Sequence, residues 1–392
     1  MRQVLIPTLG MMAVLTMCSL AIFAVAVFAP RAAPDIGVAE TAVGVFSAVT
    51  YLCGMLSGTL TGALTQRFGP VRVSQLALLA VAVGMLLMSL ATPLAALACA
   101  VLVGLGYGTL NPASALVLTR LATPRWRSLV FSLKQTGVPA GGMIAGALVP
   151  PLVVGLGWWT AAYAVSILSL LVILLIQPLR RDFDAVPRQE NHASLLGPLR
   201  LIRDTPALAG LALVGFAYGG TQVSTGAFFV VFLVSREMAL VQAGVVFLAL
   251  QAGGILGRLF WGWLGGVIAS RQLLGVVGLL AAGGVGLLLA VDATTAWWLL
   301  LPLSFLLGAC SFGWNGVFLA EIAHAAPQGR VGEATGGVQV FMFGGVVVLP
   351  PLVGLLVDLG GGYGAGFMTL IVVYLLAAGY LLSGTRGLSQ AH

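Results

Sequence analysis

Two basic residues lie deep within long apolar stretches, where a charge is costly. Lys134 lies in SLVFSLKQTGVPAGG (128–142), and Arg258 lies in GRLFWGWL (257–264). A charged side chain at the centre of a membrane costs about 2.5–3.5 kcal/mol on insertion scales, so a partner must offset this cost. Arg offers a planar fork that matches a carboxylate, and Lys offers a compact point charge. The two residues therefore predict a site for an anion.

The eleven acidic residues offer these two cations few partners. Only Glu321 falls within a predicted span, close to its cytoplasmic end, where we expect it to anchor an inner gate rather than to carry protons. Two cations with at most one acid leave the interior net positive. A water-filled cavity with this balance should attract and hold an anion.

Other interpretations of the two cations remain open. Lys134 lies about 10 Å inward of Arg127 at 1.5 Å per helical residue, so its ammonium group could instead reach the cytoplasmic headgroups. Arg258 lies about 20 Å inward of Arg271 on the same scale, and it could pair with a buried acid or donate to backbone carbonyls.

Uncharged polar side chains in the middle of several spans complete the candidate binding site. For each of them, a hydrogen bond between helices fits the pattern at least as well as contact with a ligand. Asn111 and Asn315 are favoured because they occupy corresponding positions in two halves of the chain. The candidates are Tyr51, Tyr107, Asn111, Tyr218, Gln222, Trp314, Asn315 and Gln339.

The elements that must position these side chains are transmembrane helices. Of the 392 residues, 60% are hydrophobic and 7% are charged, whereas about 25% are charged in a typical soluble domain. Apolar runs of about 18 residues or more can cross a hydrocarbon core as helices. We therefore predict an all-α membrane protein with twelve spans, at residues 5–28, 42–64, 73–91, 94–119, 128–150, 155–177, 206–233, 240–265, 272–291, 296–322, 333–357 and 364–384.

The net charge of +7 reflects the predicted topology rather than a nucleic-acid partner. With the N-terminus inside, only Arg31 and Arg236 fall on the outer side, and the basic excess on the inner side predicts that both termini are cytoplasmic. The first span is too long for the core of a signal peptide, so we expect it to be retained. Fourteen arginines fall on the cytoplasmic side: Arg2, Arg67, Arg72, Arg120, Arg125, Arg127, Arg180, Arg181, Arg188, Arg200, Arg203, Arg271, Arg330 and Arg386.

The chain divides into two similar halves at its one long polar stretch. Residues 178–205 form a predicted cytoplasmic loop between six-helix bundles at residues 1–177 and 206–392. A shift of 200 residues places CGMLSGTLTGAL (53–64) over AGGILGRLFWGWL (252–264) and VPPLV (149–153) over LPPLV (349–353). Because six spans separate the copies, they are predicted to be parallel repeats related by an axis along the membrane normal.

Six plus six helices, a basic central loop and a glycine–arginine signature after span two together resemble the major facilitator superfamily. The signature runs from Gly62 to Arg72, and Gln66 stands where the family has an aspartate. Arg67 and Arg72 remain, so the resemblance implies a cytoplasmic gate that contains Arg67, Arg72, Glu321 and Arg330. It also implies that helices five and eight pack against each other across the halves. The context of Arg258 resembles the eighth helix of monocarboxylate and other organic-anion members.

These features predict a secondary transporter or uniporter for a small organic anion, with a carboxylate as the first candidate, moved alone or with protons by alternating access. The alternative is a proton-coupled exporter of drugs or other cations, which the loose glycine–proline match TGVPAGG keeps open. No nucleotide-binding loop or catalytic set is present, and the spacing of the four cysteines fits no metal motif, so we expect neither enzyme activity nor a cofactor. We expect a monomer in the bacterial inner membrane, with the bilayer and the substrate as its partners.

Overall fold

The computed structural model describes residues 2–121, 124–184, 197–292 and 294–383 of the chain, and it is helical throughout its regular elements. The side chains of residues 1–3 and 122–129 also lie outside the description. Five of the arginines assigned to the cytoplasmic side therefore lie outside the described side chains, namely Arg2, Arg125, Arg127, Arg188 and Arg386.

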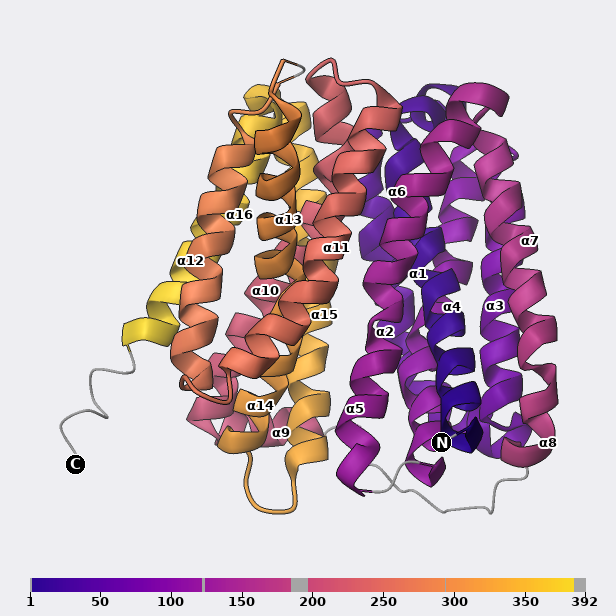
Figure 1. Cartoon of the computed structure of the whole chain (residues 1–392), viewed down its shortest axis with the longest axis vertical. Coiled ribbons are helices and arrows are strands. Elements are labelled where there is room, and N and C mark those ends of the chain that lie inside the picture. The colour runs from indigo at the N-terminus through magenta and orange to yellow at the C-terminus, as the bar shows by residue number, and fades with distance from the viewer. Residues whose placement is uncertain (1, 122–123, 185–196, 293, 384–392) are drawn as a thin grey trace. The chain divides into compact units, whose positions relative to one another are not determined.

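The chain forms two compact units, each a bundle of long helices (Figure 1). The first unit comprises Met1–Glu40 and Val49–His192, and the second comprises Thr41–Ala48 and Ala193–His392. The helices up to residue 184 are α1 (Arg2–Ile36), η1 (Glu40–Ala42), α2 (Val43–Phe68), α3 (Pro70–Met88), α4 (Pro93–Leu121), α5 (Pro124–Gln135), α6 (Gly137–Leu156), α7 (Trp158–Ile176), η2 (Gln177–Leu179) and α8 (Arg180–Phe183). The helices after residue 196 are α9 (Gly197–Asp204), α10 (Pro206–Ser235), α11 (Leu240–Leu264), α12 (Ser270–Leu288), α13 (Trp297–Gly313), α14 (Asn315–Ala325), α15 (Val331–Leu356), the π-helical η3 (Val357–Gly361) and α16 (Gly362–Ser383).

The predicted all-α fold with twelve spans is confirmed. By length and hydropathy, eleven stretches among the described residues can cross a membrane, and the last of them, Val331–Ser383, is 53 residues long. This stretch contains both α15 and α16, which are 26 and 22 residues long. Gly360 and Gly362 between them adopt positive φ angles of 94° and 56°, so the chain turns there and the stretch provides two spans.

In each unit, a glycine allows two helices to approach closely. On α4, a Cβ atom at Gly104 would overlap the backbone carbonyl of Thr50 on α2. On α13, a Cβ atom at Gly308 would overlap the backbone carbonyl of Leu250 on α11, and residues 50 and 250 are related by the 200-residue shift. In lipid, helices gain little from burying apolar side chains against each other, so small residues that permit backbone contact provide the packing.

The fifth predicted span, 128–150, is interrupted rather than continuous. It consists of α5 and α6, which are separated at Thr136 (Figure 1). Pro139 has no N–H group to donate to the carbonyl of Gln135, and its ring crowds that carbonyl. The hydrogen-bond ladder is therefore weakened around Thr136, where the backbone remains helical, and Lys134 lies in the last turn of α5.

The tenth predicted span, 296–322, is also interrupted, at Trp314 between α13 and α14. The side-chain amide of Asn315 donates to the backbone carbonyl of Phe312, at 3.2 Å from Nδ2 to O. A side chain that bonds a nearby carbonyl in this way competes with the backbone ladder of a helix. The break thus brings a polar side chain and a backbone carbonyl together in the middle of a span.

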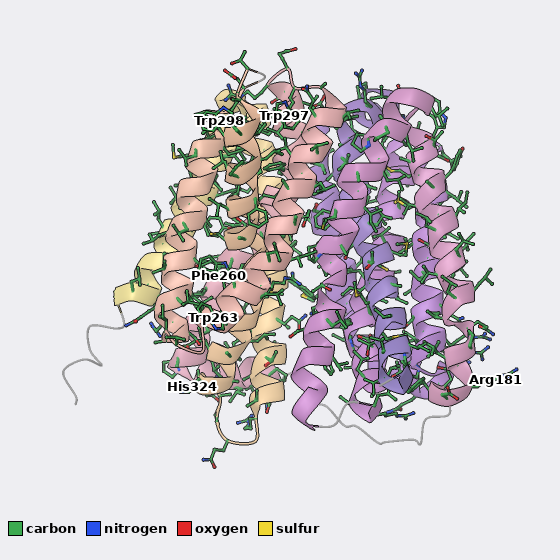
Figure 2. The ribbon with its side chains drawn as sticks, viewed as in Figure 1. Arg181, Phe260, Trp263, Trp297, Trp298 and His324 are labelled. Carbon is green, nitrogen blue, oxygen red and sulfur yellow. The ribbon has the colours of Figure 1, made fainter. Side chains whose placement is uncertain are left out.

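Large aromatic side chains mark the outside of the second unit. Trp297 and Trp298 lie at the start of α13, and Figure 2 shows them at the opposite end of this unit from His324. Phe260 and Trp263 on α11 are 50% and 67% exposed. Tryptophan favours the boundary between hydrocarbon and water, so this distribution agrees with a unit embedded in a bilayer.

Candidate functional site

Lys134 is buried in the first unit without a carboxylate partner. The residue is 2% exposed. Its Nζ atom donates to Oδ1 of Asn111 on α4 at 2.5 Å and to Oε1 of Gln135 at 3.3 Å. Among the residues that the structure describes, the ion pairs are Arg180–Asp184, Arg203–Asp204 and Arg330–Glu333, and none of them involves Lys134.

No carboxylate among the described residues therefore compensates a positive charge on Lys134. An ammonium group has three donors, and two neutral amide oxygens take up two of them here. The side chain points to Asn111 on the neighbouring helix instead of extending to an exposed surface. An anion that reached this position would supply both the missing charge and an acceptor for the third donor.

Tyrosine and asparagine side chains of α2 and α4 belong to the same unit as Lys134. Tyr107 and Asn111 are four residues apart on α4, so they lie on one face of that helix. The ring of Tyr107 packs edge-on against the ring of Tyr51 on α2, with centroids 5.4 Å apart. All three residues are partly exposed. The first unit therefore contains a polar set formed by Tyr51, Tyr107, Asn111, Lys134 and Gln135, which we call the lysine cluster.

The second unit gathers its candidate residues around the backbone carbonyl of Phe312. Arg258 on α11 donates to this carbonyl through Nε at 3.1 Å. Asn315 donates to the same oxygen, and its amide also bonds Oε1 of Gln222 on α10 at 3.3 Å. Gln222 and Asn315 are half-buried, and Arg258 is partly exposed. We call Arg258, Asn315, Gln222 and the Phe312 carbonyl the arginine cluster.

The two units use corresponding asparagines but different helices for the cation. Asn111 bonds Lys134 directly, whereas Asn315 shares a carbonyl with Arg258. The 200-residue shift places Ala334 opposite Lys134 and Gly58 opposite Arg258. Asn111 and Asn315 correspond when a gap of four residues is allowed, as Gly104 and Gly308 do, whereas the helix that carries the charge differs between the clusters.

The remaining candidates for the binding site, Tyr218, Trp314 and Gln339, belong to neither cluster. Tyr218 is 0% exposed and its hydroxyl donates to the backbone carbonyl of Leu274 at 2.8 Å. Trp314 is 1% exposed and its indole N–H donates to the carbonyl of Ser311 at 3.1 Å. Their rings pack edge-on with centroids 5.3 Å apart. Both residues thus direct their polar groups to the interior of the unit, while Gln339 on α15 is half-buried.

The signature loop between α2 and α3 is anchored by a carboxylate that the sequence pattern does not reveal. Oδ1 of Asp184 accepts a hydrogen bond from the backbone N–H of Val71 at 2.8 Å. Its Oδ2 accepts a hydrogen bond from Nε of Arg180 at 3.1 Å. Gly69 has a φ of 87°, and a Cβ atom there would overlap the carboxylate of Asp184. Asp184 thus caps the first turn of α3, where the helix dipole favours a negative charge.

The four predicted gate residues lie on helix ends or near them. Arg67 and Arg72 are exposed, and the guanidinium carbon of Arg67 lies 5.1 Å from the centroid of the Phe68 ring. Arg330 forms two hydrogen bonds with Glu333 at 2.8 and 2.9 Å, and this partner raises the pKa of Arg330 above its usual value. Glu321 is half-buried and forms no ion pair with the residues that the structure describes.

Sequence reasoning missed Gln135, the carbonyl of Phe312 and Asp184. Gln135 is adjacent to Lys134 in sequence, so its amide was a visible signal. The Phe312 carbonyl carries no side-chain signature, and it becomes available where α13 ends. Asp184 lies 113 residues from Val71, and no local pattern connects them.

Twelve membrane-spanning helices in two compact units, with polar clusters inside each unit, are the architecture of an integral membrane transport protein. The chain belongs to the Major Facilitator Superfamily, whose sequence profile matches residues 9–343. It is therefore a secondary transporter rather than an enzyme, and its partner is a small-molecule substrate.

Curated relatives support this assignment. The chain is 27% identical over 333 residues to monocarboxylate transporter 13 of Rattus norvegicus, covering 82% of this chain and 74% of the relative. It is 28% identical over 276 residues to monocarboxylate transporter 11 of Mus musculus, covering 67% of this chain and 58% of the relative.

The fold matches solved transporters of low sequence identity. A mutant of the nucleoside transporter NupG superimposes with a TM-score of 0.76 at 15% identity, with 96% of both chains covered. A mutant of a peptide transporter, POT, superimposes with a TM-score of 0.76 at 14% identity, covering 97% of this chain and 94% of that one. These structures show the fold.

Proposed function

We propose that this protein transports a small organic anion by alternating access, with monocarboxylates as the first substrate class to test. The observation that carries the proposal is the environment of Lys134. The only lysine of the chain is 2% exposed, and neutral amide oxygens of Asn111 and Gln135 hold its ammonium group. A buried cation without a counter-ion is expensive to maintain, so it favours a role in binding a mobile anion.

The roles of the individual residues follow from their chemistry. The ammonium group of Lys134 would bind one carboxylate oxygen through its third donor, while Asn111 and Gln135 fix its position. In the arginine cluster, Nε of Arg258 is held by the Phe312 carbonyl. This contact orients the guanidinium plane, whose terminal nitrogens suit bidentate contact with a carboxylate. Tyr51 and Tyr107 would contact the neutral part of a substrate bound at the lysine cluster, and Gln222 and Asn315 would do the same for a substrate bound at the arginine cluster.

The names of the two relatives point in the same direction. Both relatives are called monocarboxylate transporters, and their similarity to this chain supports an organic anion over a cation. A proton-coupled exporter of drugs or other cations would need a carboxylate at membrane depth. The described part of the first unit places none beside Lys134, which favours the anion.

We also propose the bacterial inner membrane as the location, with both termini in the cytoplasm and a monomer as the functional unit. The basic residues that follow even-numbered predicted spans support this orientation, since cytoplasmic loops carry the excess of arginine. Arg67, Arg72, Glu321 and Arg330 would then belong to the cytoplasmic gate. In a variant without the four native cysteines, a cysteine placed after residue 384 should react with an impermeant reagent only in inverted membrane vesicles.

Transport in proteoliposomes tests the proposed function. The purified protein should take up radiolabelled pyruvate or lactate, and Lys134→Ala and Arg258→Ala should each abolish uptake. Arg31→Ala is the matched control, because it removes an exposed positive charge outside both clusters.

The possible outcomes separate the candidate functions. Uptake at the wild-type rate in both cluster variants would refute the anion site. Uptake of cationic dyes without uptake of carboxylates would favour the exporter. Imposed pH gradients of opposite sign would show whether protons move with the substrate.

A further inference from the structure

Two tyrosine rings belong to the lysine cluster, although binding a carboxylate group alone does not require them. Tyr51 on α2 and Tyr107 on α4 are both partly exposed, so a ligand can reach them. Their ring centroids are 5.4 Å apart and their planes meet at 61°, which turns the edge of one ring to the face of the other. We call these two residues the tyrosine pair. It presents accessible aromatic surface in the same unit as the charged group of Lys134.

The backbones of α2 and α4 touch beside the tyrosine pair and hold it in place. A Cβ atom at Gly104 on α4 would overlap the backbone carbonyl of Thr50 on α2. A Cβ atom at Gly108 would overlap the backbone carbonyl of Gly54. All four residues lie within one helical turn of a ring of the pair. Because the two helices cannot approach more closely there, the spacing of the two rings is fixed before a ligand binds.

The tyrosine pair lies one helical turn from the group that holds Lys134. Nζ of Lys134 donates to Oδ1 of Asn111 at 2.5 Å, and Tyr107 precedes Asn111 by one turn of α4. Side chains at this spacing have Cβ atoms about 5–6 Å apart, and their Cα–Cβ bonds tilt toward the start of the helix. Asn111 therefore leans toward the turn that carries Tyr107. A carboxylate bound to Lys134 has the rest of its molecule beside the tyrosine pair.

This spacing favours a carboxylate that carries a ring over one that carries a methyl group. Carbon–carbon bonds are about 1.5 Å long, so the short chains of acetate and lactate do not cross a separation of about 5–6 Å. A phenyl ring on a short acid does cross it, and aromatic rings pack favourably face to edge or offset.

The positive charge beside the rings selects against an amino group on the ligand. An ammonium group would meet the charge of Lys134, and like charges repel. The ion pairs of the described residues place no carboxylate beside Lys134 that would offset this repulsion. An aromatic acid without an amino group thus fits the lysine cluster better than an aromatic amino acid.

We propose that the lysine cluster prefers aromatic monocarboxylates without an amino group, such as phenylacetate, over acetate, lactate and pyruvate. The carboxylate bonds the ammonium group of Lys134, and the phenyl ring packs against Tyr51 and Tyr107. This inference rests on the proposed function, because it requires that Lys134 binds a carboxylate. It adds that the tyrosine pair decides which carboxylate binds most tightly.

Calorimetric titration of the whole protein in lipid nanodiscs tests the preference. Phenylacetate and cyclohexylacetate carry the same charge and rings of similar size, but only the first ring is aromatic. Phenylacetate should bind about 2- to 12-fold more tightly, which is the usual contribution of an aromatic pair beyond its buried area. Equal affinities would overturn the proposal. Phenylalanine should bind more weakly than 3-phenylpropanoate, and the reverse order would overturn the exclusion of amino acids.

Three variants assign the preference to the tyrosine ring. Tyr107→Leu should bring the ratio of the two affinities close to one, whereas Tyr107→Phe should keep the ratio because it keeps the ring. Tyr163→Leu is the matched control and should also keep it, because Tyr163 on α7 is 42% exposed and belongs to neither cluster. An unchanged ratio in Tyr107→Leu would overturn the role of the tyrosine pair. If this variant does not fold, the wild-type comparison still decides.

Lys134→Met separates a failure of this inference from a failure of the proposed function. If the variant binds acetate and phenylacetate as tightly as the wild-type protein, the proposed anion site itself fails. If the variant loses both acids and the wild-type protein binds phenylacetate and cyclohexylacetate equally, only the preference for aromatic acids fails.

Discussion

Replacement of Lys134 by methionine should remove transport without unfolding the protein. Methionine is unbranched and similar in length to lysine but carries no charge. Removing a charge from membrane depth returns about 2.5–3.5 kcal/mol on insertion scales. The carbonyl oxygen of Asn111, the nearer of the two acceptors of Lys134, then loses its donor, which costs about 1–3 kcal/mol if the oxygen stays unbonded. The sum lies between a loss of about 0.5 and a gain of about 2.5 kcal/mol in stability.

Although Lys134→Met should leave the stability nearly unchanged or raise it, the variant should lower the affinity for a carboxylate. A hydrogen bond to a charged group contributes about 1.5–3 kcal/mol, and each 1.4 kcal/mol is a factor of about ten in affinity. Lys134→Met should therefore weaken carboxylate binding by roughly 10- to 150-fold. Thermal melting in detergent measures the stability, and the increase in melting temperature on adding a carboxylate measures the binding. Proteoliposome uptake measures the transport.

Two outcomes would refute this reasoning. If Lys134→Met melted far below the wild-type protein, the lysine would be a structural residue whose charge is compensated in the resting protein. If the variant kept carboxylate binding, the anion would bind elsewhere. Lys134→Arg is the matched variant, because it retains the positive charge in the same turn of α5 and should retain part of the binding that Lys134→Met loses.

Three further predictions concern the signature loop, the helix packing and the lysine itself. Gly69→Ala should destabilise the first unit by at least about 1–2 kcal/mol, since φ is 87° there; Gly62→Ala, which meets no atom within 4 Å, should not lower the melting temperature. Gly308→Ala should lower the melting temperature sharply, because its Cβ atom would overlap a backbone carbonyl of α11. The control Gly316→Ala should be tolerated, because a Cβ atom at Gly316 would meet no atom within 4 Å. Reductive methylation can modify only Lys134 and the N-terminal amine, and a bound carboxylate should slow the modification of Lys134; equal rates with and without pyruvate would contradict this.

Much of the fold was predictable from the sequence because the membrane imposes a simple rule. Every backbone polar group must be satisfied within the hydrocarbon, so a run of apolar residues long enough to cross becomes a helix. The repeat was visible because related packing contacts need glycine at corresponding places, as at Gly54 and Gly254. The predicted spans do not show the interruptions at Thr136 and Trp314, although Pro139 is a signal in the sequence for a bend near the first of them.

The sequence predicted the charged residues of the candidate site but not the groups that they contact. Lys134 and Arg258 were evident from the sequence alone, because a charge in an apolar run is costly wherever the run folds. The bond from Lys134 to Asn111 joins residues 23 positions apart on different helices, and the bond from Val71 to Asp184 spans 113 positions. Such partners depend on the rotation of each helix about its axis, and this rotation is set by the packing of all its neighbours.

The sequence by itself therefore determined that this chain is a twelve-helix membrane protein with two basic residues inside its apolar spans. Hydropathy and the free-energy cost of a charge in the bilayer depend on single residues and on the lipid around them, so both can be assessed from the sequence. The tertiary structure alone decided which oxygen holds each cation and that Tyr218 and Trp314 pack inside the second unit. Both outcomes depend on the rotation of each helix about its own axis, which the packing of its neighbours sets and no local pattern encodes.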